Sequence, residues 1–216
     1  MANRWWIYQK ERFPLLGHGM LIFAFSFCAV CYSSLLRNGE NASLPSAIQI
    51  IVSFSVVFIF FALLRIADEF KDFEEDSQFR AYRPVPRGLV TLRELAVVAA
   101  MGALLQLILS LILQPTLAIV LVIGWVYLAL MTKEFFFAEW LKAHPITYLW
   151  THMFIMPLVD LYATACDWSL EGQTMPPKGL LWFLLVSFFN GIVIEIGRKL
   201  RAPEDEETGV DTYSVL

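Results

Sequence analysis

The sequence predicts an all-helical, polytopic membrane protein built as one bundle of about six transmembrane helices. Hydrophobic residues make up 58% of its 216 residues and charged residues only 17%, whereas a soluble domain carries about 25% charged residues. The apolar residues gather in six runs, each close to the roughly 20 residues that a helix needs to cross a bilayer. These runs are apolar around the whole helical circumference, which excludes the surface helices of a soluble protein.

Charged residues, prolines and glycines bound each apolar run. The first run follows several basic residues, but it is too long for a signal peptide and lacks a cleavage site, so we expect it to be retained. Only Gln114-Pro115 separates the third run from the fourth, which predicts a tight hairpin. We expect spans over about 15–36, 45–65, 94–113, 115–131, 145–165 and 179–197 of a single domain covering 1–216, with a cytoplasmic tail or a truncated continuation over 204–216.

The basic residues predict the orientation, because cytoplasmic loops of membrane proteins are enriched in Lys and Arg. With the N-terminus in the cytoplasm, fourteen of the sixteen Lys and Arg residues lie inside, and only Arg37 and Lys178 lie outside. The chain is therefore expected to be a multi-pass integral membrane protein. Both of its acidic segments, 68–76 and 204–207, then face the cytoplasm.

The cysteines give no sign of redox or zinc chemistry. Cys28 and Cys31 form a Cys-x-x-Cys pair inside an apolar run, with no second pair and no nearby histidine, and Cys166 stands alone. Packing inside helices is the better account of all three.

The most informative polar segment directly follows the second apolar run. Six carboxylates lie within the nine residues 68–76, and three aspartates recur on one helical face, namely Asp68, Asp72 and Asp76. Such a cluster repels itself unless a cation lies within it, and Mg²⁺ prefers carboxylates together with substrate phosphate oxygens. Arg80 and Arg83 follow beside a Pro-x-Pro-x-Gly turn, and arginine binds phosphate through paired hydrogen bonds. A solvated acidic loop is the alternative, but the spacing favours a metal–diphosphate site for a lipid-like molecule.

A second polar segment closes the sixth run on the same side of the membrane. It is basic at first and then acidic, with these residues: Glu195, Arg198, Lys199, Arg201, Glu204, Asp205, Glu206 and Glu207. Alone, such a helix exit is ordinary. Paired with the 68–88 segment, it is a candidate second wall of one site.

The first segment resembles the UbiA-type membrane prenyltransferases. Their first motif, Asn-Asp-x-x-Asp-x-x-x-Asp, ends the second span and precedes an Arg-Pro-x-x-x-Gly turn. This chain has Asp68-Glu69-x-x-Asp72-x-x-x-Asp76, and then Arg83-Pro84-x-x-x-Gly88. Asp68 stands in place of the usual Asn and Glu69 in place of the usual Asp, and both replacements keep an oxygen ligand.

The family's second motif is only partly present. It reads Asp-x-x-x-Asp followed four residues later by Gly, and counting back from Gly209 places Asp205 at its second Asp. The first Asp falls on Arg201, or on Ala202 in the alternative alignment. The family also typically has nine spans. The resemblance therefore implies a fragment, or a shortened protein that completes its cavity with a partner subunit or a second copy.

The resemblance implies a concrete activity. Such enzymes use Mg²⁺ to hold an isoprenyl diphosphate between the two acidic motifs and transfer the isoprenyl group to a hydrophobic acceptor, aromatic or lipid, at the cytoplasmic face. By resemblance, the Mg²⁺ ligands are Asp68, Asp72, Asp76 and Asp205, of which the first three are also the catalytic candidates. The expected diphosphate-binding residues are Arg80, Arg83, Lys133, Arg198 and Lys199.

Several other polar residues are weaker candidates. Lys133 ends the fourth run, where the family often has a lysine that contacts diphosphate, although an interfacial lysine is the alternative. His152 and Asp160 are ionisable residues inside the fifth run, and for Asp160 an interhelical role is favoured because it lies nearer the outer end. Asn190 and Glu195 in the sixth run either contact an acceptor hydroxyl or hydrogen-bond a neighbouring helix.

Two other functions remain open from the sequence. One is a transferase that uses a polyprenyl phosphate, such as a phosphoribosyl-type transferase, on the same fold. The other is a diverged, non-catalytic membrane protein that binds a lipid diphosphate, which the loss of the carboxylate at Arg201 favours. Neither alternative involves nucleic acid.

Overall fold

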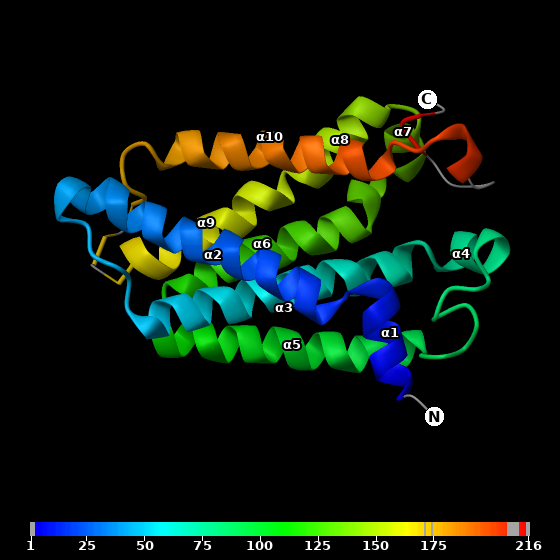
Figure 1. The fold of residues 1–216 in the computed structure, drawn as a ribbon, viewed down its shortest axis with the longest axis horizontal. Coiled ribbons are helices and arrows are strands. Elements are labelled where there is room, and N and C mark those ends of the chain that lie inside the picture. The colour runs from blue at the N-terminus through cyan, green and yellow to red at the C-terminus, as the bar shows by residue number, and fades with distance from the viewer. Residues whose placement is uncertain (1–2, 171, 174, 207–211, 215–216) are drawn as a thin grey trace.

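The chain is all-helical in the computed structural model, which describes residues 3–170, 172–173, 175–206 and 212–214 (Figure 1). No strand occurs among these residues. The α-helices are α1 (Arg4–Arg12), α2 (Leu15–Asn38), α3 (Ala47–Lys71), α4 (Phe73–Phe79), α5 (Leu92–Leu113), α6 (Leu117–Thr132), α7 (Ala138–Lys142), α8 (Pro145–Met153), α9 (Ile155–Trp168) and α10 (Leu180–Lys199). Three short 3₁₀ turns are η1 (Gly39–Asn41), η2 (Glu134–Phe136) and η3 (Pro203–Asp205).

Four helices of the described chain are long and apolar enough to cross a membrane. They are α2 continued through η1 to Asn41, α3, α5 and α10. These match four of the expected runs, the first, second, third and sixth. The 25 residues of α3 correspond to about 38 Å at a rise of roughly 1.5 Å per residue, which exceeds the hydrocarbon core of a bilayer.

The fourth and fifth expected spans differ from the prediction. The fourth is the short apolar helix α6, with 16 residues or about 24 Å. The fifth is interrupted at Phe154, which separates the nine residues of α8 from the fourteen of α9. The physical cause is Pro157, which has no N–H to donate to the carbonyl of Met153 and so removes one hydrogen bond at this point.

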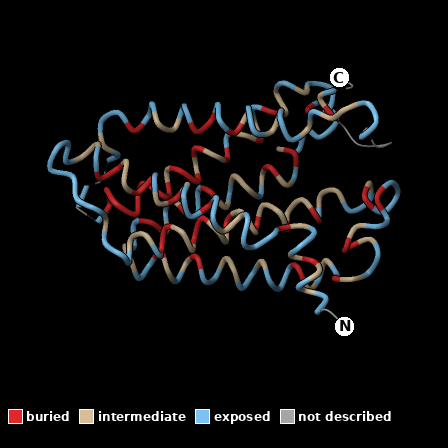
Figure 2. The backbone as a smooth tube through the Cα atoms, viewed as in Figure 1, coloured by how far each residue is buried: buried red, intermediate tan, exposed pale blue. Residues whose placement is uncertain are grey.

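Helix α9 is the centre of the bundle. It packs against α2, α3, α6 and α10, and its residues from Tyr162 to Trp168 are all buried. Buried residues gather along the same middle region in Figure 2. The buried Asp167 accepts two hydrogen bonds of 2.9 Å from Arg37 and one of 2.7 Å from Ser33, which ties α9 to α2. This ion pair keeps both charges compensated inside the protein.

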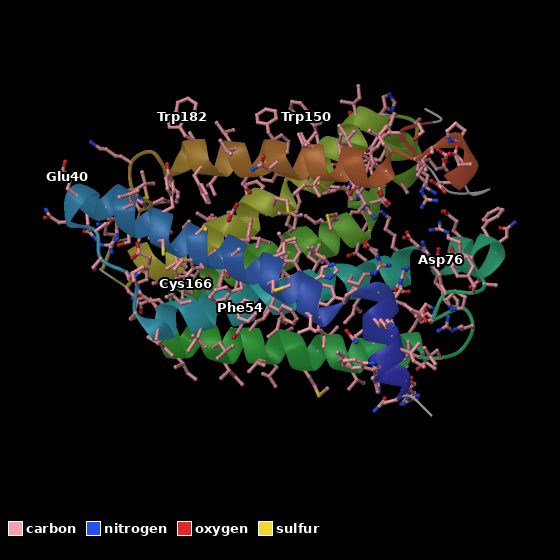
Figure 3. All side chains as sticks on the ribbon, viewed as in Figure 1. Glu40, Phe54, Asp76, Trp150, Cys166 and Trp182 are labelled. Carbon is pink, nitrogen blue, oxygen red and sulfur yellow. The ribbon has the colours of Figure 1, made fainter. Side chains whose placement is uncertain are left out.

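The polar residues separate to two ends of the bundle. Glu40 lies at one end and Asp76 at the other (Figure 3). Helix α1 crosses the Asp76 end, where Arg4 binds Glu94 of α5 and Arg12 binds Glu69 of α3. The segment with α7, the end of α10 and η3 also lies at this end (Figure 1). Both acidic segments of the sequence therefore share one end of the molecule.

Candidate functional site

The carboxylates of the 68–76 segment are exposed to different degrees, although their spacing is regular. Helix α3 ends at Lys71, Asp72 adopts φ −94° and ψ 6°, and α4 then carries Asp76. The Asp68 side chain is 47% exposed, whereas the Asp76 side chain is 2% exposed. The three aspartates therefore do not form the single open face that their spacing predicts.

Asp76 is held by arginines. Arg83 Nη1 donates to both of its carboxylate oxygens, at 2.8 and 2.6 Å, and Arg80 Nε lies 3.1 Å from Oδ1. Arg12 Nη2 lies 4.0 Å from Oδ2. Burial lowers the pKa of Arg83, but the hydrogen bond and the charge of Asp76, with smaller contributions from Tyr82 and Glu69, together outweigh burial, so the pKa of Arg83 lies above its ordinary value. Asp76 thus stabilises the arginine turn that follows α4, whose Gly88 has φ +76°.

Glu69 is the second buried carboxylate of the segment. It is 2% exposed and accepts hydrogen bonds from Arg12 and, at 3.2 Å, from Arg65. Burial is the main reason that the pKa of Arg12 lies below its ordinary value. Sequence reasoning used Arg12 only to orient the chain, because nothing in the sequence shows that α1 folds back onto α3.

Asp68 and Asp72 remain accessible for a ligand. Asp68 forms one ion pair, of 3.5 Å, with Arg65. Asp72 is partly exposed, and its carboxylate forms no hydrogen bond or ion pair within the described chain. Arg198 from the end of α10 lies close enough to Asp68 to act on its charge. The two polar segments expected from the sequence therefore lie within electrostatic range of each other at Asp68.

These side chains fit Mg²⁺ only in part. No group of three or more His, Cys, Asp or Glu side chains is placed to hold a metal ion among the described residues. However, Mg²⁺ is usually held by one or two carboxylates, with substrate phosphates and water completing its shell. Asp68 and Asp72 fit that arrangement, whereas the hydrogen bonds to Asp76 leave its oxygens committed to arginine.

The end of α10 forms the opposite wall. Glu195 accepts hydrogen bonds of 2.8–3.0 Å from Arg198 and lies 3.3 Å from Lys199 Nζ. Lys199 also lies 5.6 Å from the ring centres of Tyr148 and Tyr213. Glu195 therefore holds two of the expected diphosphate-binding cations.

The rest of the second acidic segment contributes less to this wall. Asp205 and Glu204 are exposed in η3, and Glu206 accepts hydrogen bonds from Thr212. Arg201 donates to the carbonyl of Asp205 at 3.2 Å. Glu207 lies outside the described residues. Asp205 is thus not gathered with the aspartates of α3 and α4 into one metal-binding group.

Lys133 is exposed, and it is the next residue, Glu134, that enters the protein. Glu134, Phe135 and Phe136 have φ of 50°, 52° and 65°, a left-handed conformation that costs a non-glycine residue about 1–3 kcal/mol. This turn brings the Glu134 side chain to 9% exposure. The segment Lys-Glu-Phe-Phe-Phe contains no glycine or asparagine that would predict three left-handed residues. Glu134 could therefore not be identified from the sequence.

Glu134 belongs to a polar cluster beside Asp72. Lys71 Nζ lies 2.6 Å from Glu134 Oε1 and also hydrogen-bonds to the Tyr148 hydroxyl. His152 stacks on Tyr148 with ring centres 3.9 Å apart, and its Nε2 lies 3.6 Å from Glu134 Oε2. The sequence marks His152 as a candidate because it is an ionisable residue inside an apolar run. It does not mark Glu134, the carboxylate partner of His152.

Two further candidates lie away from these walls. Asp160 is buried in α9 and faces Ser187 of α10, in keeping with the interhelical role expected for it. Asn190 is exposed on the surface of α10. An open apolar groove of about 650 Å³ lies between α1, α3 and α5, and its lining reaches Arg65, the partner of Asp68.

No protein-family model, curated protein or solved structure matches this chain. Its function therefore has to be argued from the residues themselves.

Proposed function

We propose that the chain is a Mg²⁺-dependent transferase of the UbiA type, which transfers an isoprenyl group from an isoprenyl diphosphate to a hydrophobic acceptor. One observation carries the proposal: Asp68 is 47% exposed and lies within range of the charge of Arg198 at the end of α10, and Asp72 is partly exposed one turn later, directly after α3. A diphosphate needs metal-binding carboxylates and cations side by side. An isoprenyl tail needs an apolar surface next to them, and the groove that reaches Arg65 provides one.

The exposure of each charged residue decides its proposed role in binding the metal or the diphosphate. Asp68 and Asp72 would hold the Mg²⁺, which offsets the charge that develops on the leaving diphosphate. Lys133, which is exposed, and Arg198 and Lys199, which are 62% and 26% exposed beside Glu195, are the cations that diphosphate oxygens can reach, because Arg80 and Arg83 are more buried against Asp76. The surrounding apolar helices exclude water from the carbocation-like centre that forms as the diphosphate leaves.

The proposal includes six membrane crossings with the N-terminus in the cytoplasm. Helix α6 and the α8–α9 pair run along the same long axis as the four long helices, which supports six crossings (Figure 1). The positive-inside rule supports the orientation. Single cysteines placed at Glu40 and at Ser77 in a cysteine-free variant test it. A membrane-impermeant maleimide added to intact cells should label position 40 and not position 77, and the reverse pattern would contradict the orientation.

Binding and transfer are best tested together. Purified protein in nanodiscs is expected to bind geranylgeranyl diphosphate only with Mg²⁺, and Asp72→Asn should weaken that binding at least tenfold. Glu40→Gln is the matched control, because Glu40 is an exposed carboxylate at the opposite end of the bundle. Equal binding by Asp72→Asn and the wild type would remove Asp72 from the site.

A non-catalytic binding protein is the second candidate, and the arginine bonds of Asp76 favour it, because they remove one expected metal ligand. Product masses separate the candidates after incubation with radiolabelled diphosphate and a panel of phenolic and lipid acceptors. Prenylated product supports the transferase, and Mg²⁺-dependent binding without product supports the binding protein. Turnover only with a polyprenyl phosphate donor would support the phosphoribosyl-type transferase.

A further inference from the structure

The pair formed by Glu134 and His152 has an unusual hydrogen-bond arrangement. His152 Nδ1 lies 2.9 Å from the carbonyl oxygen of Tyr148. A carbonyl only accepts, so Nδ1 must carry the proton, and the other nitrogen of a neutral imidazole then has a free lone pair. That nitrogen, Nε2, points at a carboxylate oxygen, Glu134 Oε2, at 3.6 Å.

When His152 is neutral, two acceptor atoms therefore face each other inside the protein. Both Nε2 and Oε2 are buried and lack a hydrogen-bond partner, and the two side chains are only 10% and 9% exposed. Facing lone pairs in a buried site repel one another, and a buried polar atom without a partner destabilises the folded protein. The arrangement is relieved when a proton, or a group that donates one, comes between the two atoms.

The remaining groups around the pair do not supply this proton. Lys71 donates to the other carboxylate oxygen, Oε1, and to the Tyr148 hydroxyl. Lys199 lies 5.6 Å from the centre of the Tyr148 ring and is paired with Glu195. Thr151, whose hydroxyl lies 3.5 Å from Nδ1, donates to backbone carbonyls.

The chain itself shows that this arrangement is specific to His152. His18 and His144 make the same contact between Nδ1 and a carbonyl four residues earlier, at 3.1 and 2.8 Å. Neither is paired with a carboxylate within the described part of the chain. Glu134 reaches His152 from a turn whose residues Glu134–Phe136 are left-handed, and among the described residues no other non-glycine residue has a positive φ.

We infer that the Glu134–His152 pair accepts the proton that the acceptor molecule loses on prenyl transfer, a role that rests on the proposed function. The acceptor class is then one with an ionisable O–H group, such as a phenol or an alcohol. As the oxygen bonds to the isoprenyl carbon, the bond from that carbon to the diphosphate breaks and its electron pair leaves with the diphosphate. The proton passes from the acceptor oxygen to Nε2, and the Glu134 carboxylate stabilises the resulting imidazolium.

The position of the pair supports this role. Lys71 links Glu134 to the end of α3, and the next residue is Asp72, a ligand of the proposed metal site. Tyr148 also lies close enough to Asp72 to experience its charge. The proton acceptor is thus one side chain away from the place where the diphosphate is expected.

The first test needs no substrate. Nitrogen-15 NMR of protein with labelled histidine, assigned through His152→Gln, reports which ring nitrogen carries the proton. The expected state of His152 at neutral pH is protonated Nδ1 and unprotonated Nε2. A signal showing both nitrogens protonated would mean that the pair already holds its proton, and it would overturn the inference whatever the activity.

The second test measures binding and transfer separately. His152→Gln and Glu134→Gln are expected to bind geranylgeranyl diphosphate within about twofold of the wild type and to transfer it to a phenolic acceptor about 10²–10⁴-fold more slowly. His144→Gln is the matched control and should transfer at the wild-type rate. Thermal unfolding of each variant shows that it is folded.

The outcomes distinguish the two proposals. Wild-type binding without transfer would overturn the transferase, and the proton-acceptor role with it. Transfer by the wild type and by both glutamine variants at equal rates would overturn the proton-acceptor role and leave the transferase intact. Slow transfer by His152→Gln and Glu134→Gln, with normal transfer by the control, would support the role. A third variant, His152→Ala, should recover transfer when free imidazole is added, because free imidazole does not replace a merely structural histidine.

Discussion

Arg83 binds both carboxylate oxygens of Asp76, at 2.8 and 2.6 Å, inside the turn that the sequence assigned to diphosphate binding. In this structure Asp76 is paired with arginine and so stabilises the loop. The distinction matters because Asp72, four residues earlier in the same motif, is left without a partner in the described structure. The two aspartates should therefore respond differently to the same substitution.

Asp76→Asn is expected to destabilise the protein, and Asp72→Asn is not. Removing the charge of Asp76 leaves Arg83 uncompensated in a buried setting and leaves Arg80 with only Glu75 as a partner, at a cost of about 3–5 kcal/mol. Asp72→Asn should change the free energy of unfolding by less than about 0.5 kcal/mol. Thermal unfolding in detergent, followed by circular dichroism, measures both. Similar midpoints for the two variants would contradict the assignment of Asp76 as structural.

Arg12→Met should detach α1 from the bundle. The substitution leaves Glu69 with only Arg65 as a partner, and breaking a buried ion pair costs about 3–5 kcal/mol. Arg4→Met is the control. The side chains of Arg4 and Glu94 are 51% and 31% exposed, so solvent screens their ion pair and its loss should change the stability little. Limited proteolysis at α1 reports the detachment, and equal cleavage of the two variants would refute it.

The double variant Arg12→Met/Glu69→Leu separates loss of the ion pair from loss of packing. Replacing a whole buried pair by apolar residues is often neutral, because no uncompensated charge remains. The double variant should therefore be more stable than Arg12→Met alone. If it is less stable, the buried charge of Glu69 is not what destabilises the single variant.

Two glycines of α10 make a matched pair for packing. A Cβ at Gly191 would lie 2.9 Å from Met156 Cγ of α9, whereas a Cβ at Gly197 meets nothing within 4 Å. Gly191→Ala is expected to destabilise the contact between α9 and α10 by about 1–3 kcal/mol. Gly197→Ala should stabilise the helix by about 0.5–1 kcal/mol. Relative to the wild type, the unfolding midpoint of Gly191→Ala should be lower and that of Gly197→Ala should be higher.

Much of the fold follows from the apolar runs. Four of the six expected spans appear as single long helices, because about 20 consecutive apolar residues leave few alternatives to a spanning helix. The fifth differs because its break depends on Pro157, whose missing N–H acts locally inside an otherwise continuous run. The hairpin of α5 and α6 was predicted correctly, because Gln114-Pro115 interrupts the apolar sequence and a proline ends a helix locally.

The site was less predictable, because its partners are distant in sequence. The pattern at Asp68, Asp72 and Asp76 marked the right segment, yet it could not show that Arg83 and Arg12 would bind Asp76 and Glu69. Those pairings depend on how α1 and the arginine turn fold back onto α3. Likewise, the role of Glu134 depends on three left-handed residues that the side chains of the segment do not encode in any simple way.

The central position of α9 has a consequence for how the protein is made. With 14 residues, or about 21 Å, and with Asp160 and Asp167 along it, this helix is too short and too polar to rest in lipid on its own. Arg37, which neutralises Asp167, lies in α2, which is synthesised before α9. The earlier helices α2, α3 and α6 therefore reach their final packing only after α9 has left the ribosome and inserted between them.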